Sequence, residues 1–141
     1  MFVLDDCIAF LTCREGKKLS KCLDKRLKPL HITRVQWIAI YYISQNEGIS
    51  QNYLSELMSV KEASIALLLV RMEKEGFVLR KTSEKDKRIN KIYLTKKGRI
   101  LSEKAQPVFD EFKKDVTDGI SEEELSSYKS VLYKMVKNAE K

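Results

Sequence analysis

The sequence predicts a mainly α-helical protein with a small β-hairpin near the middle of the chain. Five glycines and two prolines among 141 residues leave few places where a helix must stop. Apolar residues recur at helical spacing along most of the chain, while one central segment is rich in β-branched and aromatic residues. A chain of this length with 43% apolar residues is large enough for one core, so we expect a single domain over residues 1–141.

The first expected helix spans residues 5–28 and ends before Pro29, because a proline ring cannot continue a helix. Its apolar stripe consists of Leu4, Ile8, Leu11, Leu19, Cys22, Leu23 and Leu27. A second helix begins at Thr33, whose hydroxyl can form a capping box with Gln36, and ends at residues 46–48. Since its apolar residues lie on nearly every face, we expect this second helix at the centre of the core.

Two short helices follow, and only two residues separate them. Ser50 is a favourable N-cap for a helix over residues 51–58, and a second helix over residues 61–75 ends where Gly76 can adopt a left-handed conformation. This spacing is typical of a helix-turn-helix. The expected buried stripe of the second helix is Ile65, Leu68, Leu69 and Met72. The opposite face, available to a partner, carries Ala63, Ala66, Leu67, Val70 and Lys74.

Residues 77–82 and 89–94 are predicted to form the hairpin, around a polar turn at residues 83–88. Between residues 80 and 99 there are nine basic residues and two acidic ones, a net charge of +7 that equals the charge of the whole chain. The rest of the chain is therefore neutral. A charge excess confined to one element indicates contact with phosphates rather than a general contribution to solubility.

Two more helices complete the chain. Thr95 is expected to cap a helix that Pro107 kinks, and Ser121 forms a capping box with Glu124 before the last helix. Their apolar residues are Ile100, Leu101, Ala105, Val108, Phe109, Phe112, Val116, Leu125, Tyr128, Leu132, Met135, Val136 and Ala139. One small winged domain cannot cover so much apolar surface, so we expect these helices to pair with those of a second copy in a homodimer. The expected organisation is a winged helix-turn-helix domain over residues 33–99, flanked by dimerisation helices over residues 1–30 and 100–141.

Several motifs occur in one order and at workable spacing between residues 30 and 101. They are Thr33-Arg34-Val35-Gln36-Trp37, Gly48-Ile49-Ser50-Gln51 with Leu54, Arg71-Met72-Glu73-Lys74-Glu75-Gly76-Phe77-Val78 with Arg80, Asp86-Lys87-Arg88, and Leu94-Thr95-Lys96-Lys97-Gly98. Together they resemble the MarR family of winged helix-turn-helix transcriptional regulators. The resemblance implies a homodimer that binds double-stranded DNA.

The resemblance also implies which residues meet the DNA. The second helix of the pair enters the major groove, and its expected contact residues are Lys61, Glu62, Ser64, Ala66, Leu67 and Arg71. The hairpin is a wing, and its expected contact residues are Lys85, Asp86, Lys87, Arg88 and Lys91. By the same resemblance, Asp86 is expected to orient Arg88, and Arg88 is expected to enter the minor groove. Leu67 stands where the family often has a polar or basic residue, and its side chain suits contact with thymine methyl groups, so this position bears on base specificity.

Family members often respond to a small aromatic or phenolic effector bound between the dimer helices and the winged domain. Others respond to oxidation of a cysteine in the first helix, for which Cys7 and Cys22 are the candidates. Cys22 shares the apolar stripe of Leu19, so we expect it to be buried and inert, which favours ligand control. The main hypothesis is a ligand-responsive repressor. The alternatives are a redox-sensing regulator of the same fold, and a partner-binding winged-helix module with weak DNA specificity.

The sequence offers little to other function classes. Three cysteines without a C-x-x-C pair and the single histidine His31 give no zinc pattern, so we expect no metal. Catalytic motifs, phosphate-binding glycine loops and paired catalytic carboxylates are lacking, so we expect neither an enzyme nor a cofactor. No apolar run approaches the ~18 residues of a membrane span, and the first residues lack the basic start of a signal peptide. We therefore expect a cytoplasmic protein without a membrane partner.

Overall fold

The computed structural model describes residues 1–141, which form two compact units. The winged unit comprises residues 24–108, and the terminal-helix unit comprises residues 1–23 and 109–141. Helix α1 (Ile8–Leu27) and helix α5 (Lys96–Val116) each contribute residues to both units. No helix of the chain combines the length and apolar character needed to cross a membrane.

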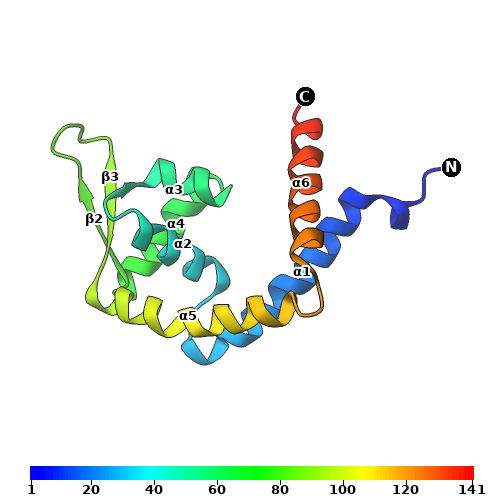
Figure 1. The fold of residues 1–141 in the computed structure, drawn as a ribbon. Helices are drawn as coiled ribbons and strands as arrows, with labels where there is room; N and C mark the ends of the chain where they lie inside the picture. Colours follow the sequence, from blue (N-terminus) through cyan, green and yellow to red (C-terminus); the bar gives the residue numbers. More distant parts are fainter. The chain divides into compact units, whose positions relative to one another are not determined.

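The winged unit contains three complete helices and three strands besides the ends of α1 and α5 (Figure 1). These elements are a short 3₁₀ turn η2 (Lys28–Leu30), α2 (Arg34–Gln45), β1 (Ile49–Ser50), α3 (Gln51–Met58), α4 (Glu62–Lys74), β2 (Val78–Thr82) and β3 (Asn90–Leu94). The predicted helix-turn-helix and hairpin occur with limits that differ by one residue at most. The predicted fold class, mainly helical with a small antiparallel hairpin as a wing, is confirmed.

The sheet has three strands rather than the two that we expected. Its order is β1-β3-β2, with both pairs antiparallel. In the added strand β1, Ile49 pairs with Ile92 and Ser50 with Lys91, and the N–H of Gly48 donates to the carbonyl of Ile92 at 2.9 Å. A strand of two residues is too short to show an alternating pattern, so only its pairing with β3 reveals it.

The core of the winged unit forms around α2, as predicted. Ala39, Ile40 and Ile43 have no exposed surface, and Trp37 is almost fully buried. The fully buried side chains that the other elements contribute are Leu27 of α1, Leu54 of α3, Ile65, Leu69 and Met72 of α4, Val78 of β2, Ile92 of β3 and Ala105 of α5. Truncating a large residue in such a core costs about 2–5 kcal/mol, so this cluster holds the helix-turn-helix and the sheet together.

Four predicted helix caps are present, one of them at Thr95, whose Oγ1 accepts a hydrogen bond from the N–H of Gly98 at 3.0 Å at the start of α5. Thr33 and Gln36 form the capping box of α2, Ser50 accepts a hydrogen bond from the N–H of Tyr53, and Ser121 forms a capping box with Glu124 at the start of α6 (Glu122–Ala139). Each such cap contributes about 1 kcal/mol to helix stability.

The amide of Gln36 also joins two helices. Its Nε2 donates to Oε2 of Glu75 at 3.0 Å, and the Gln36 side chain is almost fully buried. The start of α2 is thereby tied to the C-terminal end of α4.

The same end of α4 is fastened to the first turn of α5. Gly76 has the predicted left-handed conformation, with φ of 83°, and its carbonyl accepts a hydrogen bond from Oγ1 of Thr95. Nζ of Lys97 donates to the carbonyl of Glu75 at 2.7 Å and lies 5.0 Å from the ring centroid of Phe77. These contacts satisfy carbonyl groups that a helix end leaves without intrahelical partners.

The terminal-helix unit begins with a short 3₁₀ turn, η1 (Leu4–Asp6), before α1. We expected a helix from Asp5 to Lys28, but α1 starts at Ile8 because Cys7 has an extended backbone, with φ of −81° and ψ of 108°. Pro107 lies inside α5, which continues without interruption from Lys96 to Val116.

Few side chains of the terminal-helix unit are buried within one chain. Leu23 is its only buried residue, and neither α6 nor η1 contains one. Large apolar residues that remain exposed in this unit are Met1, Phe2, Val3, Leu4, Ile8, Leu19, Val116, Ile120, Tyr128, Val131, Tyr133 and Val136. So much exposed apolar surface on helices marks a site of association.

Candidate nucleic-acid interface

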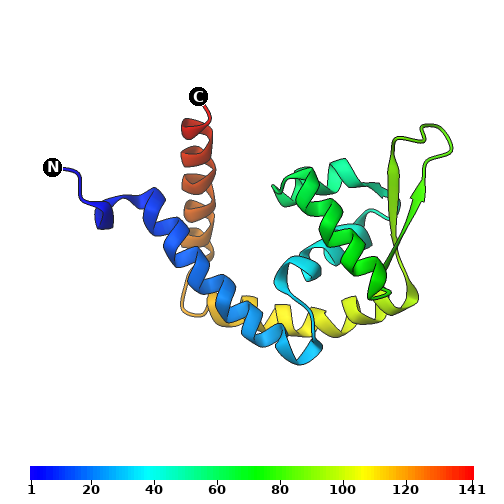
Figure 2. The ribbon, with the colours of Figure 1, turned by 180° about the vertical axis from the view of Figure 1, so that it is seen from behind.

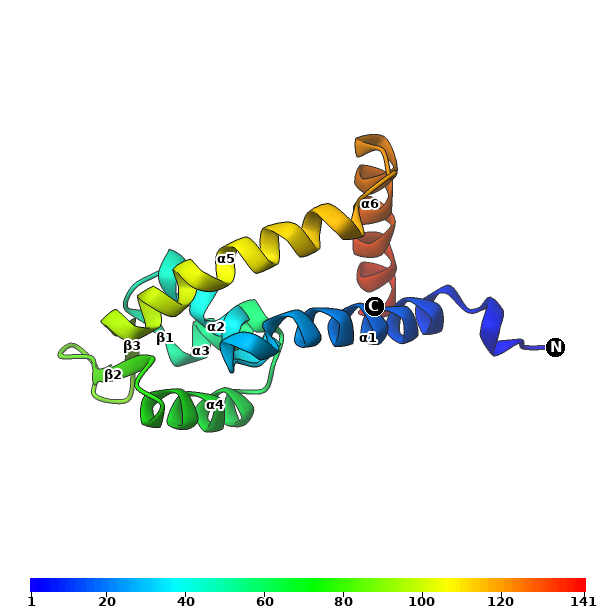
Figure 3. The ribbon, with the colours of Figure 1, turned by 90° about the horizontal axis from the view of Figure 1, so that it is seen from below.

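Helix α4 has one buried side and one exposed side. Ile65, Leu69 and Met72 have no exposed surface, whereas 73% of Leu67 and 41% of Val70 remain accessible. Leu68, which we placed in the buried stripe, is half-buried. Figure 3 shows α4 at the edge of the winged unit, where its outer side is open. A helix with a complete buried stripe and an open outer side can enter a groove without losing its packing.

The turn before α4 sets the angle between the two helices. Ser59 adopts a left-handed conformation with φ of 52°, and the N–H of Val60 donates to the carbonyl of Ser55 at 3.1 Å. Lys61 follows with an extended backbone and precedes the first residue of α4, without a side-chain capping bond. The predicted contact residue Lys61 is therefore the N-cap of α4 rather than part of its first turn.

The hairpin lies beside α4, and its turn extends beyond the helices of the unit (Figure 2). Backbone bonds close this turn: the N–H of Ser83 donates to the carbonyl of Ile89 at 2.8 Å, and the N–H of Ile89 donates to the carbonyl of Asp86 at 3.0 Å. Oγ of the buried Ser83 accepts from the N–H of Asp86 at 3.4 Å. The turn therefore has a defined shape although its long side chains are exposed.

Asp86 holds Arg88 at the tip of the hairpin. Oδ1 of Asp86 accepts hydrogen bonds from the backbone N–H and from Nε of Arg88 at 3.0 and 3.1 Å, and Oδ2 accepts from Nη2 at 3.0 Å. The hydrogen bonds from the Arg88 side chain and backbone lower the pKa of Asp86, and the carboxylate raises the pKa of Arg88. Both groups are charged at neutral pH, and the guanidinium side chain remains 90% exposed. Arg88 is thus oriented and still available to a phosphate or a groove.

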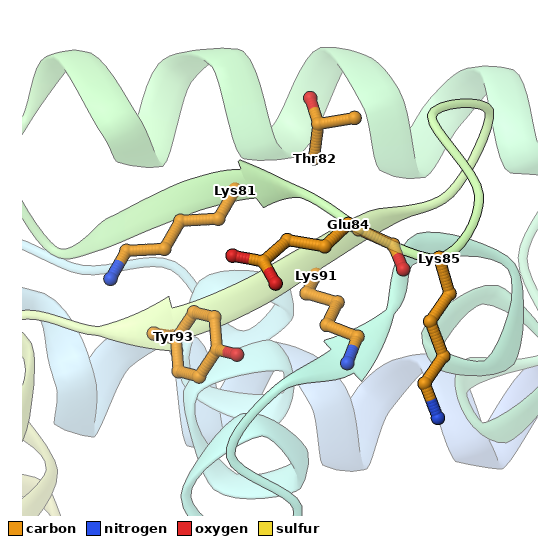
Figure 4. A pocket seen from close by; sticks show the side chains of 7 residues that line it. Lys81, Thr82, Glu84, Lys85, Lys91 and Tyr93 are labelled. Carbon is orange, nitrogen blue, oxygen red and sulfur yellow. The ribbon is translucent and has the colours of Figure 1, made fainter.

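The outer face of the hairpin carries a second group of cations. Lys81 and Lys91 are cross-strand partners, and Lys81 places Nζ 5.3 Å from the ring centroid of Tyr93. With Lys85 and Glu84 they line a hollow of about 280 Å³ (Figure 4). Like charges directly opposite each other destabilise a hairpin. An anion bound at this face would offset the repulsion between the two lysines.

Comparison with known proteins identifies a family for the unit that carries the exposed side of α4 and the basic hairpin. A model of the MarR family matches residues 32–89, from the start of α2 to the tip of the hairpin. The winged unit of the chain is thus a MarR-family domain. The chain is accordingly a DNA-binding transcriptional regulator, and regulators of this family are not enzymes.

Solved structures similar to this MarR-family chain include regulators bound to DNA. S. aureus MepR in a complex with DNA has a TM-score of 0.86 and 25% identity, over 94% of this chain and 98% of that one. The transcriptional regulator SlyA has a TM-score of 0.79 and 29% identity, over 90% of this chain and 92% of that one. A cysteine-to-serine variant of E. coli MarR complexed with operator DNA shares the fold, with a TM-score of 0.86 and 24% identity over 96% of this chain and 99% of that one.

The residues that we expected to contact DNA lie on two surfaces of the winged unit. Exposed residues of the α4 surface are Lys61, Glu62, Ser64, Leu67 and Arg71, while Ala66 is partly covered. On the hairpin, Lys85, Lys87, Arg88 and Lys91 are exposed and Asp86 is partly covered by its neighbours. We did not select Lys81, which the strand register places opposite Lys91, on the face of the hairpin that also carries Tyr93.

The cysteines of this MarR-family chain lie in the terminal-helix unit, and one of them is not where we expected it. Cys22 is exposed, whereas we predicted that it would be buried along the apolar stripe of the first helix. Leu19, on that stripe, is 49% exposed as well, so the chain itself does not cover this part of the stripe. Cys7 is half-buried at the break before α1, and Cys13 is exposed.

Proposed function

We propose that this MarR-family regulator is a homodimeric repressor that binds a two-fold DNA site and releases it in response to a small effector. The observation that carries the DNA-binding mode is the hairpin tip. There, Asp86 orients an exposed Arg88 within the segment that holds the entire +7 net charge. An oriented arginine on a basic wing suits the narrow, electronegative minor groove.

In this proposal α4 is the recognition helix. Its exposed residues meet base edges in the major groove, while Lys85, Lys87 and Lys91 of the hairpin contact phosphates. In a two-fold dimer the two copies of α4 meet half-sites about one helical turn apart, ~34 Å, so the operator is a pseudo-palindrome.

The terminal-helix unit supports a homodimer. Tyr128, Val131, Tyr133 and Val136 of α6 are between 49% and 66% exposed. A unit with a single buried residue gains little stability from its own chain, and a second copy of the same helices supplies the missing apolar partner.

A small aromatic or phenolic effector is proposed from the family resemblance and from one feature of α2. Trp37 and Tyr41 are stacked with ring centroids 5.7 Å apart, and Tyr41 is 41% exposed. A flat, partly open aromatic surface of this kind suits stacking with a planar ligand. Redox control is the second candidate, since Cys22 is exposed among the basic residues Lys21 and Lys25.

Sedimentation and DNA binding test the proposal together. At micromolar concentration we expect a species of twice the 16.4 kDa chain mass, which binds one duplex carrying the DNA between its own gene and a neighbouring gene. A footprint with two-fold symmetry is expected on that duplex. A monomer alone, or a footprint without two-fold symmetry, would contradict the proposed assembly.

Addition of the effector tests the repressor model. Candidate phenolic compounds should lower the affinity for that duplex while the protein remains dimeric. If peroxide releases the DNA and no phenolic compound does, the redox-sensing alternative replaces ligand control.

A further inference from the structure

The central part of α4 has no side chain that can form a hydrogen bond. Residues 65–70 read Ile-Ala-Leu-Leu-Leu-Val, and none of these side chains carries a donor or an acceptor. Ile65 and Leu69 are fully buried, so the exposed part of this segment is formed mainly by Leu67 and Val70, with Ala66 and Leu68 partly covered. Any contact that the middle of this helix makes with a partner is therefore apolar.

Leu67 is the most exposed large apolar side chain of the winged unit. Its exposed fraction is 73%, and the next largest there is the 48% of Tyr53. Ala63, Leu67 and Val70 follow one another at i, i+4 and i+7, so they form one stripe along the outer side of α4. The buried side of the helix is complete without them, so the packing of the unit gives no reason for an apolar stripe here.

The major groove offers one apolar group for such a stripe. The base edges present donors, acceptors and the 5-methyl group of thymine, which is the only apolar feature that distinguishes a base pair there. Leu67 and Val70 are three residues apart, ~4.5 Å along a helix, which is close to the ~3.4 Å between successive base pairs. We propose that Leu67 and Val70 read the 5-methyl groups of thymines in neighbouring base pairs of each half-site. The inference rests on the proposed DNA-binding mode of α4 and names the base feature that this helix reads.

The charges around the stripe favour DNA over a protein partner as its occupant. Lys61 precedes the stripe, and Arg71 and Lys74 follow it, all three exposed. The neighbouring hairpin adds the basic segment that includes Arg88. An apolar stripe between cations complements a polyanion that carries methyl groups in its groove.

Removal of single methyl groups from the DNA tests the inference directly. Sites are first selected from random duplex DNA with the full-length protein, and each thymine of the selected site is then replaced by deoxyuridine, which lacks only the methyl group. Replacement at the thymines that face Leu67 and Val70 should weaken binding about fourfold each, the loss that corresponds to one buried methyl group. A 5-methylcytosine in place of the same thymine should bind better than an unmodified cytosine.

Protein variants assign each methyl group to a side chain. Leu67→Ala should bind the thymine and deoxyuridine duplexes equally at one position, and Val70→Ala should do so at a neighbouring position. Leu79→Ala is the matched control, because Leu79 is a partly exposed leucine of β2 and should leave the methyl effect intact at both positions. Circular dichroism should show unchanged helix content for all three variants.

Three outcomes would overturn the inference, and they differ in what else they affect. A protein that binds no duplex would overturn the proposed function and this inference with it. A protein that binds its site but is indifferent to deoxyuridine leaves the proposed function intact and refutes methyl readout. A methyl effect that persists in both Leu67→Ala and Val70→Ala assigns the readout to other residues, and the stripe is then available to a protein partner.

Discussion

Gly98 in the first turn of α5 lies directly against the carbonyl oxygen of Phe77. A Cβ atom at this position would approach that oxygen much closer than van der Waals contact allows, and the obstacle is backbone rather than a flexible side chain. The two residues join the start of α5 to the chain just after Gly76. A side chain at position 98 must therefore push apart the two segments that hold the end of α4.

We predict that Gly98→Ala destabilises the protein by about 1–3 kcal/mol, the range expected when a close-packed site is overfilled. Gly16→Ala is the matched control, because position 16 lies inside α1 with no atom within 4 Å of the added Cβ. Alanine favours a helix there, so Gly16→Ala should stabilise the protein by about 0.5–1 kcal/mol. Thermal unfolding measures both changes, and equal melting temperatures for the two variants would contradict the close approach at Gly98.

Loss of the hairpin arginine should weaken DNA binding without affecting the fold. We predict that Arg88→Ala lowers affinity by about tenfold or more, since a hydrogen bond from a charged donor contributes about 1.5–3 kcal/mol. Asp86→Ala should have a smaller effect, because Arg88 stays charged but loses its orientation. Arg14→Ala is the control: Arg14 also pairs with an aspartate, Asp5 at 3.2 Å, but lies in the terminal-helix unit. Fluorescence anisotropy with a labelled operator should give three different affinities for these variants. Equal affinities would refute the role of Arg88 and Asp86 in DNA binding.

The orientation of Arg88 should not depend on pH in the neutral range. The pKa of Asp86 is lowered in the folded protein, so the interaction is present above the ordinary pKa of an aspartate and is lost only as the pH falls through the lowered value. Arg88 stays protonated throughout. The ratio of the affinities of wild type and Asp86→Asn should therefore be constant from about pH 6 to about pH 8. A ratio that changes across this interval would show that another titrating group controls the hairpin tip.

Phosphate contacts are visible in the salt dependence of binding. We predict that Lys87→Ala and Lys91→Ala each reduce the slope of log affinity against log salt by about one for each phosphate that the lysine neutralises, or by about two in a dimer. Lys134→Ala, an exposed lysine of α6 in the terminal-helix unit, should leave the slope unchanged. If all three slopes equal that of the wild type, these lysines do not neutralise phosphates.

Thiol oxidation should not be the main switch, although Cys22 is exposed. Cys7 directly precedes α1, and its neighbour Ile8 is fourteen residues from Cys22 along that helix, ~21 Å, so no disulfide can join the two cysteines within one chain. Operator titrations with reduced and peroxide-treated protein should give similar affinities. A large loss of affinity that a thiol reductant restores, and that Cys22→Ser or Cys7→Ser abolishes, would identify a redox sensor instead.

Local signals in the sequence are sufficient to predict most of the secondary structure of the winged unit. The cap at Ser50, the capping box at Thr33 and the left-handed Gly76 are each determined by neighbours within a few residues, and all three are present. The β-branched, aromatic and apolar residues on either side of a polar turn likewise predict the hairpin. Where a feature depends on residues distant in sequence, prediction was wrong or incomplete. Strand β1 exists only through its pairing with β3.

The candidate site also contains some features that nearby residues predict and others that depend on residues distant in sequence. The Asp-x-Arg spacing within a turn predicts the paired tip, and the structure has that pair. The exposure of Cys22 could not be predicted, because an apolar stripe identifies a face that is to be covered but not which chain covers it. Lys81 was missed for a related reason: its importance lies in its cross-strand partner Lys91 and the ring of Tyr93, which only the strand register brings together.

The two sides of α4 have a consequence for how such a regulator diversifies. Ile65, Leu69 and Met72 fix the helix in the core, and a change at any of them destabilises the whole unit. Leu67 and Val70 contribute little to that core, so substitutions there alter what the helix meets at small thermodynamic cost. In the proposed DNA-binding mode, one or two point mutations on the outer side of α4 therefore change the preferred operator while the protein keeps the same scaffold. The outer side of α4 can therefore change during evolution while its buried side keeps the winged unit stable.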